Sequence, residues 1–311
     1  MIQSVEKEKR TYPDPQLSNV FNYQEAFKRN RGLVSRDEQE KLRNATVAIP
    51  GLGGVGASHA IALARSGVGR FILGDFDSYE LSNFNRQMSA NIHRIGMSKA
   101  EAVREDILNI NPDISVTVWE EPITADNVSR FLEQADILLD GVDLFSMKAR
   151  RAILNEAERK GIHAVIAGPL GFSCAMVHFA PGGMGFDKYF DMCDGIDEED
   201  MVARFVVGLS PKLSHSSYMD MSEVDLEGKT GPSLGLACMF CSAVAAAETV
   251  KAVLGRGRIL PAPHYIQIDL YKLRMYKGKL RFGGRGPIQK LKRYILMHTV
   301  KKLIAQKHKD T

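Results

Sequence analysis

The stretch Gly51-Leu52-Gly53-Gly54-Val55-Gly56 decides the fold of this 311-residue chain. It follows a short apolar run at 45–50 and precedes helical spacing at 57–66, the context in which a G-x-G-x-x-G pattern has a physical function. The glycines permit a tight turn, and the helix N-terminus offers unpaired N–H groups and a positive dipole to a phosphate. The stretch therefore predicts a nucleotide site; the alternative is a turn that only packs a helix against a sheet.

Short apolar runs and helical segments alternate along the rest of the chain. The expected strands are 45–50, 71–74, 114–118, 137–140, 163–167, 264–269 and 273–276, and the expected helices are 35–43, 57–66, 99–108, 234–254 and one from Pro287 onward. This alternation predicts an α/β fold: a doubly wound (Rossmann-like), mostly parallel sheet with helices on both faces. Residues 181–233 lack a clear period and are expected to form a long variable loop region, before C-terminal strands and a basic helix.

The composition indicates an ordinary folded protein, and we expect a cytoplasmic one. Hydrophobic residues make up 44% of the chain and charged residues 25%, with 12 prolines, which excludes a disordered or fibrous class. No window approaches the roughly 18 uninterrupted apolar residues of a membrane span. Glu6 and Lys7 stand where a signal peptide would be apolar, and four irregularly spaced cysteines fit a reducing compartment.

Charge is distributed unevenly over three expected parts: an N-terminal arm at 1–40, a nucleotide-binding domain at 41–271 and a basic extension at 272–311. The extension holds thirteen lysines and arginines against one acid, Asp310, whereas the whole chain has a net charge of only +4. Its helix is expected to present most of its apolar residues on one face, namely Ile288, Leu291, Ile295, Leu296, Val300, Leu303 and Ile304. Such a helix suits anionic lipid, RNA phosphates, or the protein's own core or dimer partner.

Polar side chains follow the second and fourth expected strands. Asp75 ends the strand at 71–74, where a carboxylate can accept hydrogen bonds from a ribose. Arg86 and Lys99 follow it, and their cationic groups suit the oxygens of a triphosphate better than a nicotinamide ring. Asp143 comes just after the strand at 137–140, where an acid can hold magnesium over the crevice of a doubly wound sheet.

In their order and spacing these motifs resemble the ubiquitin-activating-enzyme-like adenylyltransferases, the ThiF, MoeB and HesA family. The resemblance covers about residues 31–143. Its motifs are G-x-G-G-x-G, D-x-D at Asp75 and Asp77, S-N-x-x-R-Q from Ser82 to Gln87, Lys99 after a glycine turn, and D-x-x-D ending at Asp143. Asp77 and Gln87 belong to this set, but their roles are less defined.

The resemblance implies a role for each matched position. Asp75 would bind the ribose, Asn83 and Arg86 the phosphates, and Lys99 the phosphates and the developing charge. Asp143 would bind magnesium. The cofactors implied are therefore ATP and Mg²⁺, and 41–271 would be an adenylation domain.

The resemblance also implies a homodimer with composite sites. Arg31, within Arg29-Asn30-Arg31-Gly32, matches the N-terminal arginine that homodimeric members insert into the neighbouring subunit's site.

The family chemistry is attack of a carboxylate on the α-phosphorus of ATP, which gives an acyl-adenylate and pyrophosphate. Since a carboxylate is already ionised at pH 7, no general base is needed, and the difficulty is to bring one anion onto another. The acceptor expected first is the C-terminus of a ubiquitin-like or sulfur-carrier protein. The alternatives are a small-molecule or peptide carboxylate and a tRNA threonylcarbamoyl group.

Cysteines raise two further hypotheses. Cys193 lies in the variable region where a thioester-forming nucleophile could reach an adenylate, but its acidic neighbours Asp191 and Asp194 disfavour a thiolate. Cys238 and Cys241 form a single C-x-x-C pair on an apolar helix. Zinc normally needs four ligands, so we expect helix packing and no zinc.

Two other protein classes remain as alternatives. A dinucleotide-dependent oxidoreductase is disfavoured by the polar set at Asn83, Arg86 and Lys99. A non-catalytic nucleotide-binding partner protein is disfavoured because every charged position of the motifs is present.

Overall fold

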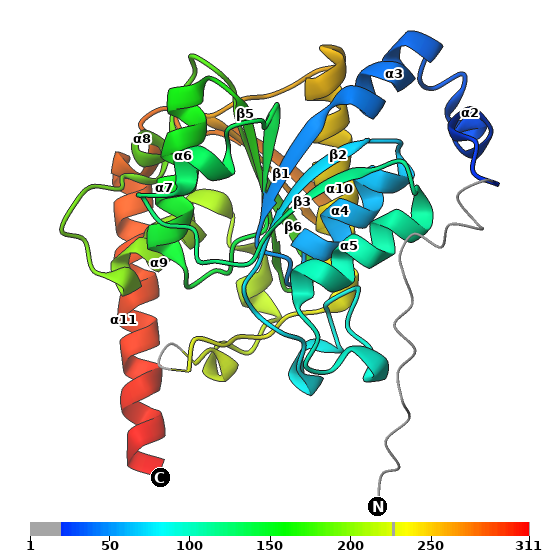
Figure 1. The fold of residues 1–311 in the computed structure, drawn as a ribbon. Coiled ribbons are helices and arrows are strands. Elements are labelled where there is room, and N and C mark those ends of the chain that lie inside the picture. Colours follow the sequence, from blue (N-terminus) through cyan, green and yellow to red (C-terminus); the bar gives the residue numbers. More distant parts are fainter. Residues whose placement is uncertain (1–19, 226–227, 311) are drawn as a thin grey trace, which may run out of the picture.

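The computed structural model describes residues 20–225 and 228–310, with side chains described through Thr299. A single eight-stranded sheet in the order β3-β2-β1-β4-β5-β6-β7-β8 forms its centre (Figure 1). The strands are β1 Thr46–Pro50, β2 Arg70–Gly74, β3 Ser115–Trp119, β4 Ile137–Asp140, β5 His163–Leu170, β6 Ser173–Phe179, β7 His264–Asp269 and β8 Arg274–Lys279. The first five are parallel and the last three antiparallel, so the predicted fold class is confirmed.

Helices cover both faces of the sheet. The α-helices are α2 Tyr23–Ala26, α3 Arg36–Asn44, α4 Gly56–Arg65, α5 Lys99–Ile110, α6 Val128–Phe131, α7 Met147–Lys160, α8 Phe186–Phe190, α9 Glu198–Leu209, α10 Gly235–Leu254 and α11 Pro287–Asp310. The 3-10 helices are η1 Lys28–Asn30, η2 Leu81–Asn83, η3 Ile92–Arg94, η4 Ser214–Ser217, η5 Met221–Glu223 and η6 Gly283–Arg285. In Figure 1, α4, α5 and α10 lie on one side of the sheet, and α6 to α9 lie on the other.

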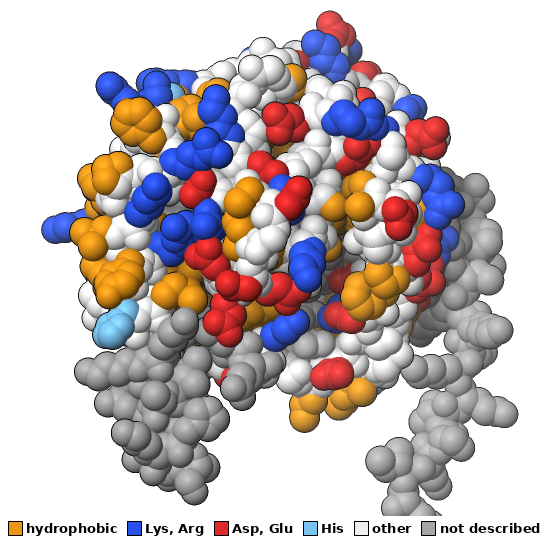
Figure 2. All heavy atoms as spheres, turned by 90° about the vertical axis from the view of Figure 1, so that its left-hand side faces the viewer, with side chains coloured by type: hydrophobic (Ala, Val, Ile, Leu, Met, Phe, Trp, Pro, Cys, Tyr) orange, Lys and Arg blue, Asp and Glu red, His pale blue; other side chains and the backbone are white. Residues whose placement is uncertain are grey.

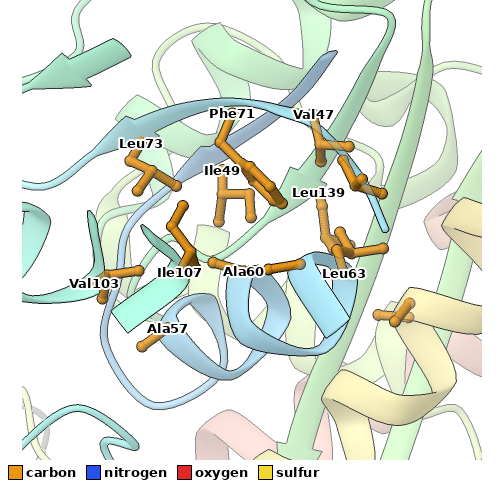
Figure 3. Packing of buried hydrophobic residues seen from close by; sticks show 14 of the residues in the cluster. Val47, Ile49, Ala57, Ala60, Leu63, Phe71, Leu73, Val103, Ile107 and Leu139 are labelled. Atoms are coloured by element: carbon orange, nitrogen blue, oxygen red, sulfur yellow. The ribbon is translucent and has the colours of Figure 1, made fainter. Parts of the chain in front are cut away.

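The two faces carry separate cores because successive strand side chains point to opposite sides. In β1, Val47 and Ile49 pack with α4 and α5, whereas Ala48 belongs to the core under α7 and α9. Figure 3 shows Ala60 and Leu63 on the side of α4 that faces the strands. Burial of each large apolar side chain stabilises the fold by about 1.5–3 kcal/mol.

Strand register places the ends of the central strands at one edge of the sheet. Pro50 pairs with Gly74, and Ala48 with Leu138, so β4 ends at Asp140 level with the end of β1. The chain segments that follow β1, β2 and β4 therefore emerge together, as ligand-binding loops do in doubly wound sheets.

Helix α10 is the one described helix long and apolar enough to cross a membrane by length and composition. It packs against β5, β6 and α4 and buries Cys241 and Ala245 in the core. It ends where Gly255 adopts φ 65°. Its packing against the sheet accounts for the apolar residues on its buried side, whereas Leu236 and Met239 are exposed.

Several regions differ from the sequence expectations, among them 147–160, which forms α7 although no helix was expected there. The segment 181–233 is not irregular throughout, because α8 and α9 lie in it. In the part of α11 whose side chains are described, Ile288, Leu291 and Ile295 share one face, and that face is exposed. Leu296 is half-buried and lies on another face, which differs from the expected single apolar face.

Candidate active site

The glycine turn between β1 and α4 allows close approach of backbone to backbone. Gly51 has φ +82°, and a Cβ there would lie 2.3 Å from Gly141 O. A Cβ on Gly56 would lie 1.8 Å from Gly51 O. Neither position accepts a larger residue, so the turn brings the N-terminus of α4 against the loop that follows β4. This places unpaired N–H groups at the ligand edge of the sheet.

Asp75 links the end of β2 to this turn. Its Oδ2 accepts a hydrogen bond from Leu52 N at 2.6 Å, and its Oδ1 accepts one from Asp77 N at 2.9 Å. Burial raises the pKa of Asp75, an effect that these two N–H groups and the charge of Lys99 oppose. An ionised carboxylate has about four acceptor positions, so two stay available for hydroxyl donors of a ligand.

Lys99 is the first residue of α5 and is almost completely buried. Its Nζ lies 2.9 Å from Asp77 Oδ2, and its backbone N–H donates to Asp77 O at 2.9 Å. Ser98 caps the helix by accepting from Glu101 N. The D-x-D motif thus holds the glycine turn through its first acid and the lysine through its second.

Arg86 and Gln87 lie beside the same turn. A Cβ on Gly54 would lie 3.8 Å from Arg86 Cγ, and one on Gly53 would lie 3.8 Å from Gln87 Nε2. Arg86 Nη1 donates to Ser82 O at 2.9 Å, which holds the side chain within its own loop. Gln87 Oε1 is buried and has no hydrogen-bond partner among the described residues. An orphaned acceptor of this kind beside a turn is consistent with a ligand donor.

Asn83 is buried, and its side chain stabilises the loop that carries Arg86. Its Oδ1 accepts from Glu80 N at 3.0 Å, and its Nδ2 lies 3.5 Å from Ser82 Oγ. Only the amide N–H₂ group, which makes this one long contact, is free to reach a phosphate.

Asp143 is exposed just beyond β4, on the loop that faces the glycine turn. Its Oδ2 accepts from Phe145 N at 2.8 Å, which leaves Oδ1 open. Within the described residues no group of three or more His, Cys, Asp or Glu side chains could hold a metal. A single open carboxylate nevertheless fits Mg²⁺, which is usually bound by one or two carboxylates, phosphates and waters.

Arg150, which the sequence analysis missed, positions the Asp143 loop. Its Nε lies 2.8 Å from Asp140 Oδ2, both side chains are almost completely buried, and its guanidinium also donates to Val142 O. The guanidinium stacks 4.4 Å from the centre of the Phe205 ring. No local sequence pattern indicates the contact between Arg150 and Asp140, because Arg150 lies on α7, ten positions after Asp140.

Within this chain, Arg31 lies apart from the other candidate site residues. It follows η1 and is exposed, while its neighbour Asn30 donates to Ser66 O at the C-terminal end of α4. Tyr23 OH donates to Gly67 O at 2.6 Å in the same region. The N-terminus of α4 carries the glycine turn, so Arg31 lies at the opposite end of that helix from its own chain's site.

The cysteines occupy different environments. Cys193 is exposed and lines a surface hollow of about 440 Å³ with Lys148 and Arg151 of α7. Cys238 is buried against the glycine turn, where a Cβ on Gly54 would lie 3.0 Å from its Sγ, and burial raises its pKa. Cys241 is also buried, and burial beside Cys174 raises its pKa. Both cysteines of the C-x-x-C pair take part in packing.

Comparison with known proteins identifies the chain's relatives. The ThiF family model matches residues 27–282. The probable adenylyltransferase/sulfurtransferase MoeZ of Mycobacterium tuberculosis is 30% identical over 228 residues, 72% of this chain and 51% of MoeZ. The tRNA threonylcarbamoyladenosine dehydratase of Haemophilus influenzae is 31% identical over 156 residues, 50% of this chain and 59% of that protein. The chain thus spans about half the length of the curated relatives it matches.

Solved structures share the fold. A crystal structure of PaaA superposes with a TM-score of 0.64 at 20% identity, covering 83% of this chain and 82% of PaaA. Escherichia coli MccB with ATP superposes with a TM-score of 0.59 at 22% identity, covering 81% of this chain and 68% of MccB. At these identities the likeness concerns architecture alone.

Proposed function

Because the chain belongs to the ThiF family, we propose that it is an ATP- and Mg²⁺-dependent adenylyltransferase that converts a substrate carboxylate to an acyl-adenylate and releases pyrophosphate. The observation that carries this proposal is the coupling of the glycine turn to Lys99 through Asp75 and Asp77. These contacts bring a carboxylate that suits a ribose and an ammonium that suits a phosphate close to the turn at the N-terminus of α4. ATP fits this arrangement because it presents a ribose and three phosphates together.

The residues act by positioning and by neutralising charge. Asp75 accepts from the ribose hydroxyls, while the N–H groups of the glycine turn cradle the phosphates. Arg86 and Lys99 exchange their present partners, Ser82 O and Asp77, for phosphate oxygens. These cations reduce the repulsion between an incoming carboxylate and the α-phosphate, which is the main barrier to the reaction.

Asp143 is the residue proposed to hold Mg²⁺. When bound, the ion would neutralise negative charge on the phosphates. Arg150 acts as a positioning residue, because its contacts with Asp140 and Val142 O fix the loop that carries Asp143.

The active assembly is proposed to be a homodimer. Arg31 lies near the C-terminal end of α4, away from the glycine turn at its N-terminus, which supports a role in the neighbouring subunit's site. Each site would then combine one chain's Asp143 with the other chain's Arg31.

The acceptor proposed first is the C-terminal carboxylate of a ubiquitin-like or sulfur-carrier protein. The 30% identity to MoeZ over 72% of this chain supports this choice. A second candidate is a peptide or small-molecule carboxylate. The fold likeness to MccB, a microcin C7 biosynthetic enzyme, suggests this candidate. A tRNA-linked carboxylate is the third, on the strength of the dehydratase relative.

ATP–pyrophosphate exchange, measured with carrier proteins, peptides, small carboxylic acids and tRNA in turn, tests the proposal. We expect exchange with one acceptor class and none without an acceptor. The matched control is Asp143→Asn, which keeps an acceptor for Phe145 N but loses the charge that holds the metal. Exchange that persists in this variant would remove Asp143 from the mechanism, and tight ATP binding without exchange under any acceptor would favour a non-catalytic nucleotide-binding protein.

A further inference from the structure

Helix α11 docks on the protein through charged side chains. Arg293 lies 3.5 Å from Asp200 of α9 and 3.7 Å from Asp191. Lys292 donates to Pro211 O, and Arg285, just before the helix, lies 2.9 Å from Asp191. These contacts fix the rotation of α11 about its own axis. Lys292 and Arg293, which an amphipathic surface helix would normally turn to solvent, therefore face the body of the protein.

The opposite face of α11 exposes an apolar stripe, which we define as Ile288, Leu291, Tyr294 and Ile295. Their exposed fractions are 63%, 59%, 70% and 54%, and Phe282 ahead of the helix is 73% exposed. The spacing 288, 291, 295 follows one side of a helix. Figure 2 shows hydrophobic side chains gathered with lysines and arginines on this side of the molecule. A contiguous apolar surface of this kind normally marks an interaction site.

Basic residues lie close to the stripe in the sequence. Arg281 and Lys290 are exposed beside it, and the sequence adds Lys301, Lys302, Lys307 and Lys309 further along α11. From residue 272 onward the chain has thirteen basic residues and one acid, while the remainder holds more acids than bases. Because the body is acidic and the extension is basic, the electrostatic potential that attracts anions lies on the α11 side.

We propose that the apolar stripe and the basic residues near it in the sequence bind the surface of an anionic lipid bilayer. Isoleucine, leucine and tyrosine side chains enter the boundary between headgroups and acyl chains, while lysine and arginine pair with anionic headgroups. RNA explains the cations but not the apolar stripe. A second copy of α11 explains the stripe, but it would bring two strongly basic segments together. The bilayer alone satisfies both features.

The placement of α11 suits this role. The helix lies at one side of the molecule, and its C-terminal part extends past α9 and beyond the body (Figure 1). The stripe can therefore approach a flat surface without interference from the helices that cover the sheet. This surface function is independent of the nucleotide chemistry.

Co-sedimentation of the full chain with vesicles tests the proposal. We expect binding to vesicles of phosphatidylcholine with phosphatidylglycerol, little binding to phosphatidylcholine alone, and weakening by salt. The double variant Leu291→Gln/Ile295→Gln should lower the partition coefficient by about tenfold or more, because it removes apolar burial without changing charge. The matched control is Leu273→Gln, an exposed apolar residue outside α11, which should bind as the unmodified chain does.

A second measurement does not depend on those variants. In a Tyr294→Trp variant, brominated phosphatidylglycerol should quench the new fluorescence, since the stripe would enter the acyl boundary. Circular dichroism and the urea midpoint check that each variant is folded. The proposal would be overturned if the chain did not bind anionic vesicles, or if Leu273→Gln lowered binding as much as the double variant does. It would also be overturned if the chain bound tRNA but not vesicles and the double variant kept the binding to tRNA.

Discussion

Lys99 Nζ lies 2.9 Å from Asp77 Oδ2, so the buried cation of the candidate site is paired with a carboxylate of its own chain. Asp77 is more exposed than Lys99, and its backbone N–H in turn donates to Asp75 Oδ1. A triphosphate must therefore share or displace this pair. The arrangement keeps an isolated ammonium from being buried without a partner, which would be costly.

Lys99→Met should lower ATP–pyrophosphate exchange by about 100-fold or more, because it removes one charge-stabilising donor. The methionine keeps most of the buried apolar stem, and the partly exposed Asp77 stays hydrated, so the free energy of unfolding should change by only about 1 kcal/mol. Exchange assays and urea unfolding measure the two effects. Unchanged exchange would exclude Lys99 from phosphate binding.

Arg31→Ala and Asp143→Asn should each be inactive alone and active when mixed. Subunit exchange would give heterodimers in which one of two sites has both an intact Arg31 and an intact Asp143. About a quarter of the unmodified activity should return if half of the dimers are mixed. Pyrophosphate exchange after mixing at equal concentrations is the measurement, and no recovery despite verified subunit exchange would contradict composite sites.

Arg150→Met should destabilise the protein by about 3–5 kcal/mol, because Asp140 would keep a buried charge without its partner. The double variant Arg150→Met/Asp140→Asn removes both charges and should recover part of this loss. Urea unfolding of the single and double variants checks the effect. Equal losses in the two would show that the ion pair is not what Arg150 contributes.

Acid should weaken the fold through His59. Burial of the ring, slightly offset by the backbone of Asp140, lowers the pKa of His59 to about 3. In the unfolded chain His59 binds a proton near pH 6.5. The contribution of the neutral, buried ring to the free energy of unfolding is therefore complete above that pH and is lost as the pH falls toward 3. Burial lowers the pKa of His215 to about 4, which acts in the same direction.

The measurement for His59 is the free energy of unfolding between pH 6.5 and 4.5. Over this interval the free energy of unfolding of His59→Leu should fall by about 2–3 kcal/mol less than that of the unmodified chain. His215 stays in place in both proteins and serves as the common background. Parallel curves for the two proteins would mean that His59 is not held neutral.

Local sequence patterns predicted most of the sheet, because apolar runs that end in Gly or Asp are strong strand signals. The strands at 137–140 and 264–269 match β4 and β7 at both ends. Helix α9 was missed because its acidic first turn resembles loop composition. Asp197 nevertheless caps it, and buried Met201, Phe205 and Leu209 follow at four-residue spacing. That signal was present in the sequence.

Tertiary contacts decided the features that local patterns did not predict. Asp191 and Asp200 determine which face of α11 turns inward, and neither acid lies near α11 in sequence. Arg150 likewise gains its role only when α7 packs beside Asp140. The roles assigned to Arg31 and Asp143 stay predictions, which the experiments above address.

A crystal structure with Mg²⁺ and a non-hydrolysable ATP analogue tests the central claim most directly. The account predicts the triphosphate on the turn at 51–56, the ribose on Asp75, and both Arg86 and Lys99 moved from Ser82 O and Asp77 onto phosphate oxygens. A nucleotide bound elsewhere, or bound at the turn while both cations keep their present partners, would contradict it.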